Sequence, residues 1–521
     1  MPRFSIVIPV RNRAYTLYHT LKTCLNQHAF DDYEIIVSDN ESEDNVAEMV
    51  REFNSDKIKY FRTGSFLSMT DNYNFALSKA TGEYIIFLGS DDAVCTYGLY
   101  FLDKIISITG EKIINWRNSG YYWPDYIPSH NKNSLVLWKF NTTIIRDAKN
   151  HVKKVVNGSE NMFELPLLYV RSAVHKSLID NLISRSGFMF DSAIPDIYSG
   201  FALSSIVKYY ITIGISVCMS GLSGGSIGMA FKYYENLSET IGLLTAGSRH
   251  VKGKFLANGV KADIESVLMD SFNCAKENLD AFSDIHVDIG ILIKIVIETC
   301  YNNNKYCGNI GRENFQKELS IISQVIENDA EYKANFIGGS LNIHDYEFYE
   351  PIRCRAPVIN NGRLKLDASL FGIENIYDAT LFAEKLLYSK EYLDVYLEDF
   401  ERNWNKTKSN FEWLCKYKRI GIFGAGAYTG EILKGLPFFG PKEADVFLFD
   451  NDKGKWGSSF CNYEVLPPKS IPNHELDVLF ISSPKFQDEI YGDVKKYEQA
   501  MEIVKLYEKL GESFSPSIIS K

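Results

Sequence analysis

The sequence predicts an α/β protein whose N-terminal part folds around a mainly parallel sheet. Over the first hundred residues, short apolar runs alternate with segments of helical spacing. The same alternation returns from Arg419 onward, and helical spacing dominates between the two regions. A chain of 521 residues is also too long for one ordinary core. We therefore expect three domains, which cover residues 1–235, 236–414 and 415–521.

The apolar runs of the first domain are the expected strands, at residues 4–10, 33–38, 58–61 and 84–88. The helices between them are expected at residues 15–27, 46–53 and 71–80. Later helices are expected at residues 173–183, 197–209, 264–282, 285–301 and 315–326. The last domain should have strands at residues 419–423, 446–449 and 478–481, with a helix that follows the first of them and ends near 436.

Composition excludes several classes of protein. Hydrophobic residues make up 45% of the chain, which is enough to form packed cores and excludes general disorder. The net charge of −10 argues against a nucleic-acid-binding protein. The nine cysteines include no CxxC pair, so reduced thiols in a cytoplasmic protein are expected rather than a zinc site or disulfide framework. The apolar runs are shorter than the ~20 residues that a membrane-spanning helix needs. No membrane-spanning helix is therefore predicted.

Acidic residues follow two of the predicted strands, at the sheet edge where open α/β sheets bind ligands. Asp39 could accept hydrogen bonds from a base or a ribose, or it could start an Asx turn or cap the next helix. Asp91 and Asp92 follow the small residues Gly89 and Ser90. Paired carboxylates of this kind can bind Mg²⁺ or Mn²⁺ together with substrate phosphates, although a solvated turn is the simpler interpretation.

Three segments in this order strongly resemble family 2 glycosyltransferases of the GT-A fold: Ile6 to Asn12, Ile35 to Asn40, and Ala80 to Asp92. The resemblance implies an inverting transfer from a nucleotide-diphosphate sugar, assisted by a divalent metal. It places Pro9, Arg11 and Asp39 in the nucleotide pocket, with Asp39 at the base.

The resemblance makes Ser90 and Asp91 the second and third positions of the Asp-x-Asp motif. Asp91 is then the expected metal ligand and Asp92 its neighbour in the donor site. The chain departs from the family at Gly89, which stands where the first aspartate is common. Glycine offers no side chain to metal or ribose.

A second stretch, from Leu165 to Ser199, resembles the acceptor half of such enzymes, in which an acidic residue is the general base. Asp196 is the first candidate and Asp191 the second, because an inverting transfer needs a carboxylate within reach of the acceptor hydroxyl. Asp196 could instead cap a helix. His175 could contact acceptor or metal, but a structural role is the stronger interpretation.

The C-terminal segment carries glycines at 424, 426 and 430 directly after a predicted strand. Gly424, Gly426 and Gly430 would let backbone N–H groups approach a phosphate at a helix start, and Asp450 follows the next strand, where an acidic residue could bind a ribose hydroxyl. The spacing is GxGxxxG rather than GxGxxG. This segment resembles the small Rossmann-like nucleotide- or sugar-binding domains appended to bacterial sugar-processing enzymes.

Together these features predict a bacterial, cytoplasmic glycosyltransferase. Its donor would be a nucleotide-diphosphate sugar, with UDP as the first candidate nucleotide. Its acceptor would be a capsule or O-antigen glycan, either free or lipid-linked at the inner membrane face. The middle domain would bind acceptor or form a homo-oligomer. Two alternatives stay open: an NAD(P)-dependent sugar-modifying enzyme that acts through the C-terminal domain, and a non-catalytic nucleotide-binding scaffold.

Overall fold

The structure is a computed structural model that describes most of the chain: residues 1–127, 131–138, 143–226, 258, 260, 264–337, 339–350, 356–360, 362–441, 444–461, 463–483 and 485–506. The chain divides into two compact units. The first contains residues 1–141 and 146–394, and the second contains residues 142–145 and 395–521. The expected domain boundary near 235 lies outside the described residues, so the three-domain division stays a prediction.

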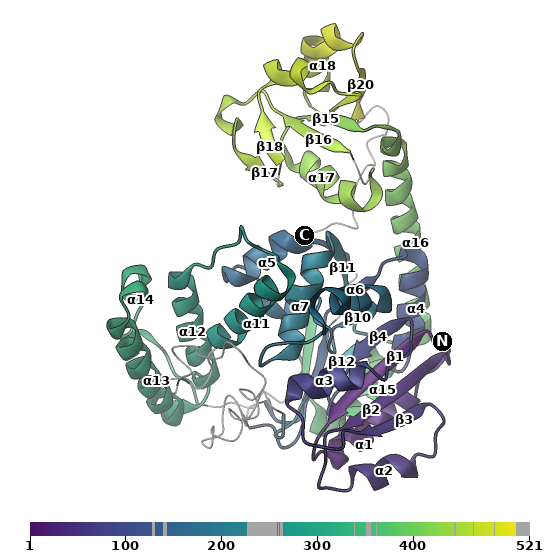
Figure 1. The fold of residues 1–521 in the computed structure, drawn as a ribbon, viewed down its shortest axis with the longest axis vertical. Coiled ribbons are helices and arrows are strands. Elements are labelled where there is room, and N and C mark those ends of the chain that lie inside the picture. The colour runs from purple at the N-terminus through teal and green to yellow at the C-terminus, as the bar shows by residue number, and fades with distance from the viewer. Residues whose placement is uncertain are drawn as a thin grey trace. The chain divides into compact units, whose positions relative to one another are not determined.

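The first unit is built around an eight-stranded sheet in the order β3-β2-β1-β4-β10-β6-β11-β9, of which residues 143–145 of β9 are assigned to the second unit (Figure 1). The first four strands in this order are parallel, and β10 runs antiparallel to both of its neighbours. The strands in chain order are β1 (Phe4–Val10), β2 (Tyr33–Asp39), β3 (Ile58–Arg62), β4 (Tyr84–Phe87), β6 (Ile113–Trp116), β9 (Thr143–Asp147), β10 (Ser172–His175) and β11 (Tyr209–Ile213).

The central strands form where the sequence is mainly apolar, and the buried polar residues Ser5 and Glu34 hydrogen-bond to each other at 2.6 Å. Every residue of β2 and β4 is buried, and only Pro9 of β1 is partly exposed. Strands covered on both faces need no polar face, which explains why they read as apolar runs rather than as alternating patterns. The α/β class and the four expected N-terminal strands are confirmed.

A second sheet of the same unit has the order β13-β14-β8-β7-β12-β5. Its strands are β5 (Ala93–Val94), β7 (Ser119–Tyr122), β8 (Ser134–Trp138), β12 (Cys218–Leu222), β13 (Val358–Asn360) and β14 (Arg363–Asp367). The antiparallel pair of β13 and β14 comes from a part of the chain for which we predict helices. The residues of β13 are exposed and those of β14 become buried only toward its end, so no continuous apolar run marks the pair in the sequence.

The helices before residue 390 belong to the first unit, and α16 (Lys390–Glu412) begins in the first unit and lies mainly in the second. Those of the first three hundred residues are α1 (Ala14–Leu25), α2 (Val46–Glu52), α3 (Met69–Leu77), α4 (Gly98–Thr109), α5 (Ala148–Val156), α6 (Lys176–Ser186), α7 (Pro195–Ile206), α11 (Ile264–Leu279) and α12 (Ile289–Asn304). The others before residue 413 are α13 (Gly308–Asn328), α14 (Ala330–Asn335), α15 (Ile376–Leu386) and α16 (Lys390–Glu412). One expected helix, 173–183, begins three residues late because residues 172–175 form β10 between β4 and β6.

Among the described residues of the first unit, two apolar cores join helices to the sheet or to one another. The larger joins the sheet to α5, α6, α7 and α11, and Phe201 and Phe272 meet in it edge to face at 5.5 Å between ring centroids. The smaller packs α12 against α13, around residues such as Ile293 and Phe315. The larger core seats the start of α7 beside the sheet, which matters for the site described below.

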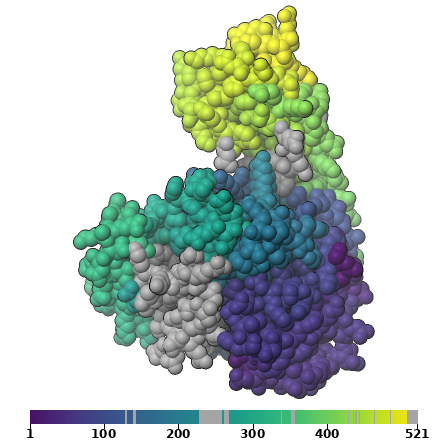
Figure 2. All heavy atoms as spheres, viewed as in Figure 1, coloured from purple at the N-terminus to yellow at the C-terminus, as the bar shows by residue number. Residues whose placement is uncertain are grey.

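The second unit contains a sheet in the order β17-β18-β16-β15-β19-β20. Its elements are β15 (Arg419–Phe423), α17 (Ala427–Phe439), β16 (Asp445–Phe449), β17 (Ser459–Phe460), β18 (Tyr463–Leu466), β19 (Val478–Ile481), α18 (Gln487–Val494) and β20 (Glu502–Lys505). All pairs except β17 with β18 are parallel. Figure 2 shows these residues, light green to yellow, gathered in one body.

Candidate active site

The carboxyl ends of β1, β2 and β4 meet at one edge of the first sheet. Val10 pairs with Asp39 across β1 and β2, and Val7 pairs with Phe87 across β1 and β4. Since the strands are parallel, the loops that follow them must gather at this edge. The edge therefore brings together the two acidic segments that the sequence singles out.

Asp39 is fully buried at the end of β2. Its carboxylate accepts a hydrogen bond from the backbone N–H of Ser42 at 2.8 Å and another from the hydroxyl of Tyr60 at 2.5 Å. Burial, followed by the bond to Asp39, raises the pKa of Tyr60, so the phenol stays a donor. The bond to Ser42 is the turn contact expected from the simpler interpretation, and it leaves acceptor capacity on the carboxylate.

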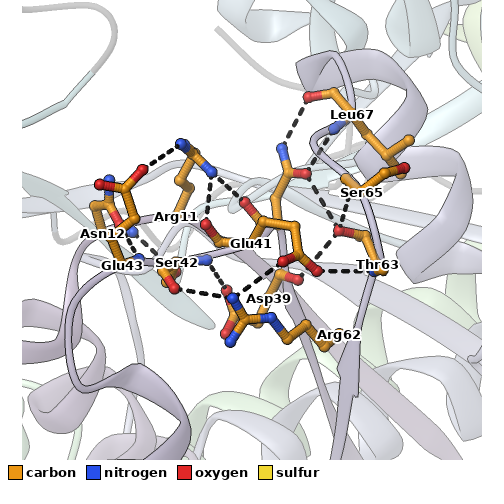
Figure 3. A network of polar contacts seen from close by, with 12 residues as sticks. Arg11, Asn12, Asp39, Glu41, Ser42, Glu43, Arg62, Thr63, Ser65 and Leu67 are labelled. Atoms are coloured by element: carbon orange, nitrogen blue, oxygen red, sulfur yellow. Dashed lines mark hydrogen bonds and ion pairs between the residues drawn. The ribbon is translucent and has the colours of Figure 1, made fainter.

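Arg11 holds the loop that follows Asp39 (Figure 3). Its guanidinium donates to the carbonyls of Asn40 and Glu41, each at 2.7 Å, and its Cζ lies 4.7 Å from the ring centre of Phe66. Pro9, the other expected pocket residue, lies in β1 opposite Ser38. Arg11 thus shapes the loop, and its contact with Phe66 brings an aromatic face to the same side of the sheet.

The turn after β4 is buried at Ser90, Asp91 and Asp92. Asp92 accepts from the N–H groups of Gly89 at 2.7 Å and Gly221 at 2.8 Å. A solvated turn is therefore excluded for this pair, because each of the two residues is at most 3% exposed.

The carboxylate of Asp91 faces different partners from that of Asp92. It accepts from the hydroxyl of Ser223 at 2.5 Å and lies 4.0 Å from the guanidinium of Arg13. Burial and the neighbouring Asp91 raise the pKa of Asp92 above its usual range. A cation beside Asp91 would relieve this repulsion.

A divalent metal would need ligands from substrate here. Among the described residues, no three His, Cys, Asp or Glu side chains form a group that could bind a metal by themselves. Asp91 fits a metal that takes one protein carboxylate plus diphosphate and water oxygens, as Mg²⁺ often does. Asp91 is therefore the residue that would hold it.

The structure explains the glycine that precedes this turn. A Cβ atom at Gly89 would lie 2.4 Å from the hydroxyl oxygen of Tyr169 and 2.9 Å from a carboxylate oxygen of Asp92. Tyr169 also hydrogen-bonds to Asp92, which acts to lower the pKa of that carboxyl. The phenol thus fills the space that a side chain at position 89 would need.

Asp196 lies in the first turn of α7, after Ile194 at the N-cap and Pro195. The carboxyl is partly exposed, but its burial raises its pKa to about 6. The N–H groups of Asp196 and Ile197, and the charge of Arg171, oppose that rise. Asp196 is therefore not the helix cap, and its environment is that of a carboxylate that can exchange a proton near neutral pH.

Two partly buried tyrosines connect Asp196 to the acidic turn. Tyr73 of α3 and Tyr169 each interact electrostatically with Asp91, Asp92 and Asp196, and these interactions raise the pKa of both phenols in addition to burial. The fold thus brings Asp196 close to Asp91 and Asp92, which lie about a hundred residues earlier in the chain. Tyr73, Tyr169, Arg13, Arg171 and Ser223 are site residues that sequence reasoning missed, since nothing in their local sequence marks them.

Asp191 and His175 have other surroundings. The carboxylate of Asp191 accepts from the side-chain amide of Asn278 at 2.7 Å. His175 pairs with Tyr84 at the start of β4, so it lies at the opposite end of that strand from Asp91. It caps α6 by accepting from the N–H of Ser177 at 3.1 Å, which is the structural role that we expect for it.

Gly221 gives a direct stability test of the acidic turn. A Cβ atom there would lie 1.6 Å from the carbonyl oxygen of Asp91, so Gly221→Ala should destabilise the protein by about 1–3 kcal/mol or more. Gly225→Ala is the matched control in the same loop, since its Cβ would meet only Arg13, at 3.9 Å. Thermal unfolding of both variants checks this, and equal melting temperatures would contradict the packing at Gly221.

In the second unit, the glycine segment follows β15 and its contacts are internal. Gly424 has φ +108°, which favours glycine, and Gly426 is the N-cap of α17. Gly430 donates its N–H to the carbonyl of Gly426.

Asp450, at the end of β16, accepts from the N–H of Ala425 at 2.7 Å and from Lys455 at 3.1 Å. Burial acts to raise its pKa, but its N–H donors and Lys455 outweigh burial and lower it. The predicted acidic residue thus lies beside the glycine loop.

Two family models match parts of this chain. Residues 5–99 match "Glycosyl transferase family 2", and residues 416–504 match "C2185-like, N-terminal".

Among curated proteins, a Campylobacter jejuni GalNAc(5)-diNAcBac-PP-undecaprenol beta-1,3-glucosyltransferase is 36% identical over 102 residues, which are 19% of this chain and 33% of that protein. The Escherichia coli UDP-Glc:alpha-D-GlcNAc-diphosphoundecaprenol beta-1,3-glucosyltransferase WfgD is 33% identical over 88 residues, which are 17% of this chain and 34% of that protein. The chain thus spans about a third of the length of these relatives.

Among solved structures, S. aureus TarS 1-349 in complex with UDP-GlcNAc aligns with 63% of this chain and 91% of its own length, at 14% identity and a TM-score of 0.33. That score is too low to support an argument, so the assignment rests on the matched sequence. The matched residues 5–99 include β1, β2, β4, Asp39 and the acidic turn. The N-terminal part of this chain is therefore a glycosyltransferase family 2 domain.

Proposed function

We propose that the protein is an inverting glycosyltransferase that moves a sugar from a nucleotide-diphosphate donor, with UDP as the first candidate, to a hydroxyl group of a surface glycan. The observation that carries this proposal is the convergence of Asp91, Asp92 and Asp196 around Tyr73 and Tyr169, at the sheet edge formed by the family 2 domain. In this arrangement Asp39 lies at the nucleotide base and Arg11 shapes its pocket.

The chemistry assigned to the residues is a single displacement. Asp196 takes the proton of the acceptor hydroxyl as its oxygen forms a bond to the anomeric carbon, and the bond from that carbon to the diphosphate oxygen breaks on the opposite face. Mn²⁺ or Mg²⁺, held through Asp91, would offset the charge that develops on the departing diphosphate. The raised pKa of Asp196 suits this role, because a base works best with a pKa near the working pH.

The acceptor is proposed to be a lipid-linked glycan. Both curated relatives carry names with an undecaprenol-linked diphosphate acceptor, which supports this class without fixing the sugar. Among the described residues, we find no helix with the length and apolar character to cross a bilayer. Contact with the inner membrane face would therefore be peripheral in a cytoplasmic enzyme of this kind.

The rest of the chain is proposed to support this reaction. We assign residues 236–414 to acceptor binding or homo-oligomer formation. We assign residues 415–521 to a Rossmann-like domain that binds a nucleotide or sugar through Gly424, Gly426, Gly430 and Asp450. The parallel order of β16, β15 and β19 and the position of Asp450 beside Ala425 support this assignment.

A thermal unfolding assay of the full chain tests the proposal, because a ligand that binds only the folded state raises its melting temperature. The ligands are UDP, GDP, dTDP, CMP, NAD and NADP, each with and without Mn²⁺. We expect a Mn²⁺-dependent rise with one nucleoside diphosphate that Asp39→Ala abolishes and Asp450→Asn leaves intact. A rise with NAD or NADP alone, lost in Asp450→Asn, would overturn the transferase and favour the C-terminal alternative.

A further inference from the structure

Arg171 lies in a firmly anchored segment between Tyr169 and β10. Trp116 holds this segment from the sheet, because its indole N–H donates to the carbonyl of Val170 and its backbone N–H to that of Arg171, both at 2.9 Å. Ser199 of α7 holds it from the other side by accepting from the N–H of Leu168 at 2.8 Å. The backbone of Arg171 is therefore fixed between the sheet and the helix that carries Asp196.

The guanidinium of Arg171 has no polar partner among the described residues: neither a hydrogen bond nor an ion pair reaches it. The guanidinium instead lies over the ring of Phe163, whose centre is 5.1 Å from the guanidinium carbon. The nearby carboxylate of Glu164 is already paired with Arg146 at 2.6 Å. Arg171 thus differs from Arg3, Arg11 and Arg146, each of which donates to an oxygen of the protein.

The position of this charge points to a ligand. Arg171 follows Tyr169 by two residues and interacts electrostatically with Glu164 most strongly, and then with Asp92, Asp196 and Tyr169, so it lies near the candidate active site. Burial lowers its pKa, yet a guanidinium keeps its proton in proteins. Arg171 is partly exposed, and the part of its charge that the protein shields from water costs free energy unless an opposite charge or hydrogen-bond acceptors offset that cost. The described part of the protein supplies no such acceptor in direct contact.

We propose that Arg171 binds a phosphate or diphosphate group of a substrate. The planar fork of guanidinium N–H donors matches phosphate oxygens, which makes arginine well suited to this task. This inference rests on the proposed transferase function and deepens it, since two sources of the anion exist in that reaction. One is the diphosphate of the donor, and the other is the phosphate that links a glycan acceptor to its lipid.

The test compares Arg171→Gln and Arg171→Lys with Arg51→Gln, all in the full chain. Arg51 is an exposed arginine of α2, paired with Glu48 at 3.6 Å, so its variant removes one positive charge away from the site. Calorimetry measures the binding of UDP and of uridine with Mn²⁺ present. Kinetics measure KM and kcat for acceptors with and without the linking phosphate.

If the donor supplies the anion, Arg171→Gln should weaken UDP binding by about 10- to 100-fold, the loss expected for a hydrogen bond between charged groups, and leave uridine binding unchanged. If the acceptor supplies the anion, the affinity of Arg171→Gln for UDP should equal that of wild type. The KM of the phosphate-bearing acceptor alone should then rise by a similar factor, with kcat unchanged. Arg171→Lys should lose less in either case, because it keeps the charge and loses the fork.

Two results would overturn the inference. The first is that Arg171→Gln, or Arg171→Lys if the glutamine variant does not fold, matches wild type in all these measurements. The second is that Arg51→Gln shows the same loss. Failure of the transferase proposal looks different: wild type then binds no nucleoside diphosphate. In that case inorganic pyrophosphate is the probe, and equal binding by wild type and Arg171→Gln rejects the role of Arg171.

Discussion

Asp196→Asn should lower the rate of sugar transfer by about 10²- to 10⁴-fold, the usual loss when one well-placed base is removed. Asparagine keeps the shape of the side chain but cannot take the proton of the acceptor hydroxyl. Donor binding should not change, because Asp196 acts on the acceptor. The measurements are steady-state transfer and UDP affinity of the full chain.

Asp191→Asn is the matched comparison, since Asp191 lies five residues earlier and is bonded to Asn278. We expect it to retain transfer within a few-fold, apart from any loss of stability. If Asp191→Asn stops transfer and Asp196→Asn does not, Asp191 is the base and the assignment to Asp196 is wrong.

Stability separates loss of chemistry from loss of folding in Asp196→Asn. The pKa of Asp196 is raised from 3.8 to about 6 in the folded protein, so the folded state holds the proton more tightly than the unfolded state. At pH 7 the carboxyl is ionised in both states, and its burial costs up to about 3 kcal/mol. This cost disappears as the pH falls from 6 to 4. Asparagine avoids it, so above pH 6 the variant should melt no lower than wild type.

The same pKa predicts how transfer depends on pH. Asp196 must be ionised to act as a base, so kcat/KM should fall tenfold per pH unit below a midpoint near 6. The expected profile rises with pH and levels off above about 7. A profile that stays flat down to pH 4.5, in a protein that remains folded, would contradict Asp196 as the base.

The N-terminal fold could be predicted because its elements follow local rules. Strands β1, β2 and β4 are almost entirely buried, so their sequences are mainly apolar and each is followed by a polar turn. The pair β13 and β14 could not be predicted, since β13 is exposed and β14 pairs with β8, more than two hundred residues earlier in the chain. Strand β10 could not be predicted either, because the apolar spacing of its segment fits a helix equally well.

The candidate site divides in the same way. Asp39 and Asp91 could be found from their positions after apolar runs, because parallel strands bring such residues to one edge. The approach of Asp196 to Asp91 depends on how α7 packs on the sheet, and only the family resemblance suggested it. Nothing in the local sequence marks Tyr169 or Arg171 as a site residue. Tyr169 matters because it fills the space beside Gly89, and Arg171 matters because its charge has no charged partner in direct contact in the described structure.

Asp91→Asn should remove the metal dependence of donor binding and lower transfer by about 10²-fold or more, since a metal supplies several kcal/mol of stabilisation to the leaving group. Asp92→Asn is the natural comparison, because the two residues are adjacent and equally buried. The carboxylate of Asp92 accepts from Gly89 and Gly221, so its loss should act mainly on stability.

Asp91, in contrast, accepts from the hydroxyl of Ser223 at 2.5 Å, accepts from the backbone N–H of the same residue at the longer distance of 3.4 Å, and faces Arg13 at 4.0 Å. Turning toward a cation would therefore break only this longer backbone contact, whereas Asp92 would lose two backbone hydrogen bonds of 2.7 and 2.8 Å. Titration of each variant with Mn²⁺ in the presence of UDP distinguishes the two residues. If Asp92→Asn loses the metal response while Asp91→Asn keeps it, the ligand is Asp92, and the hydrogen bonds to Gly89 and Gly221 must then open when donor binds.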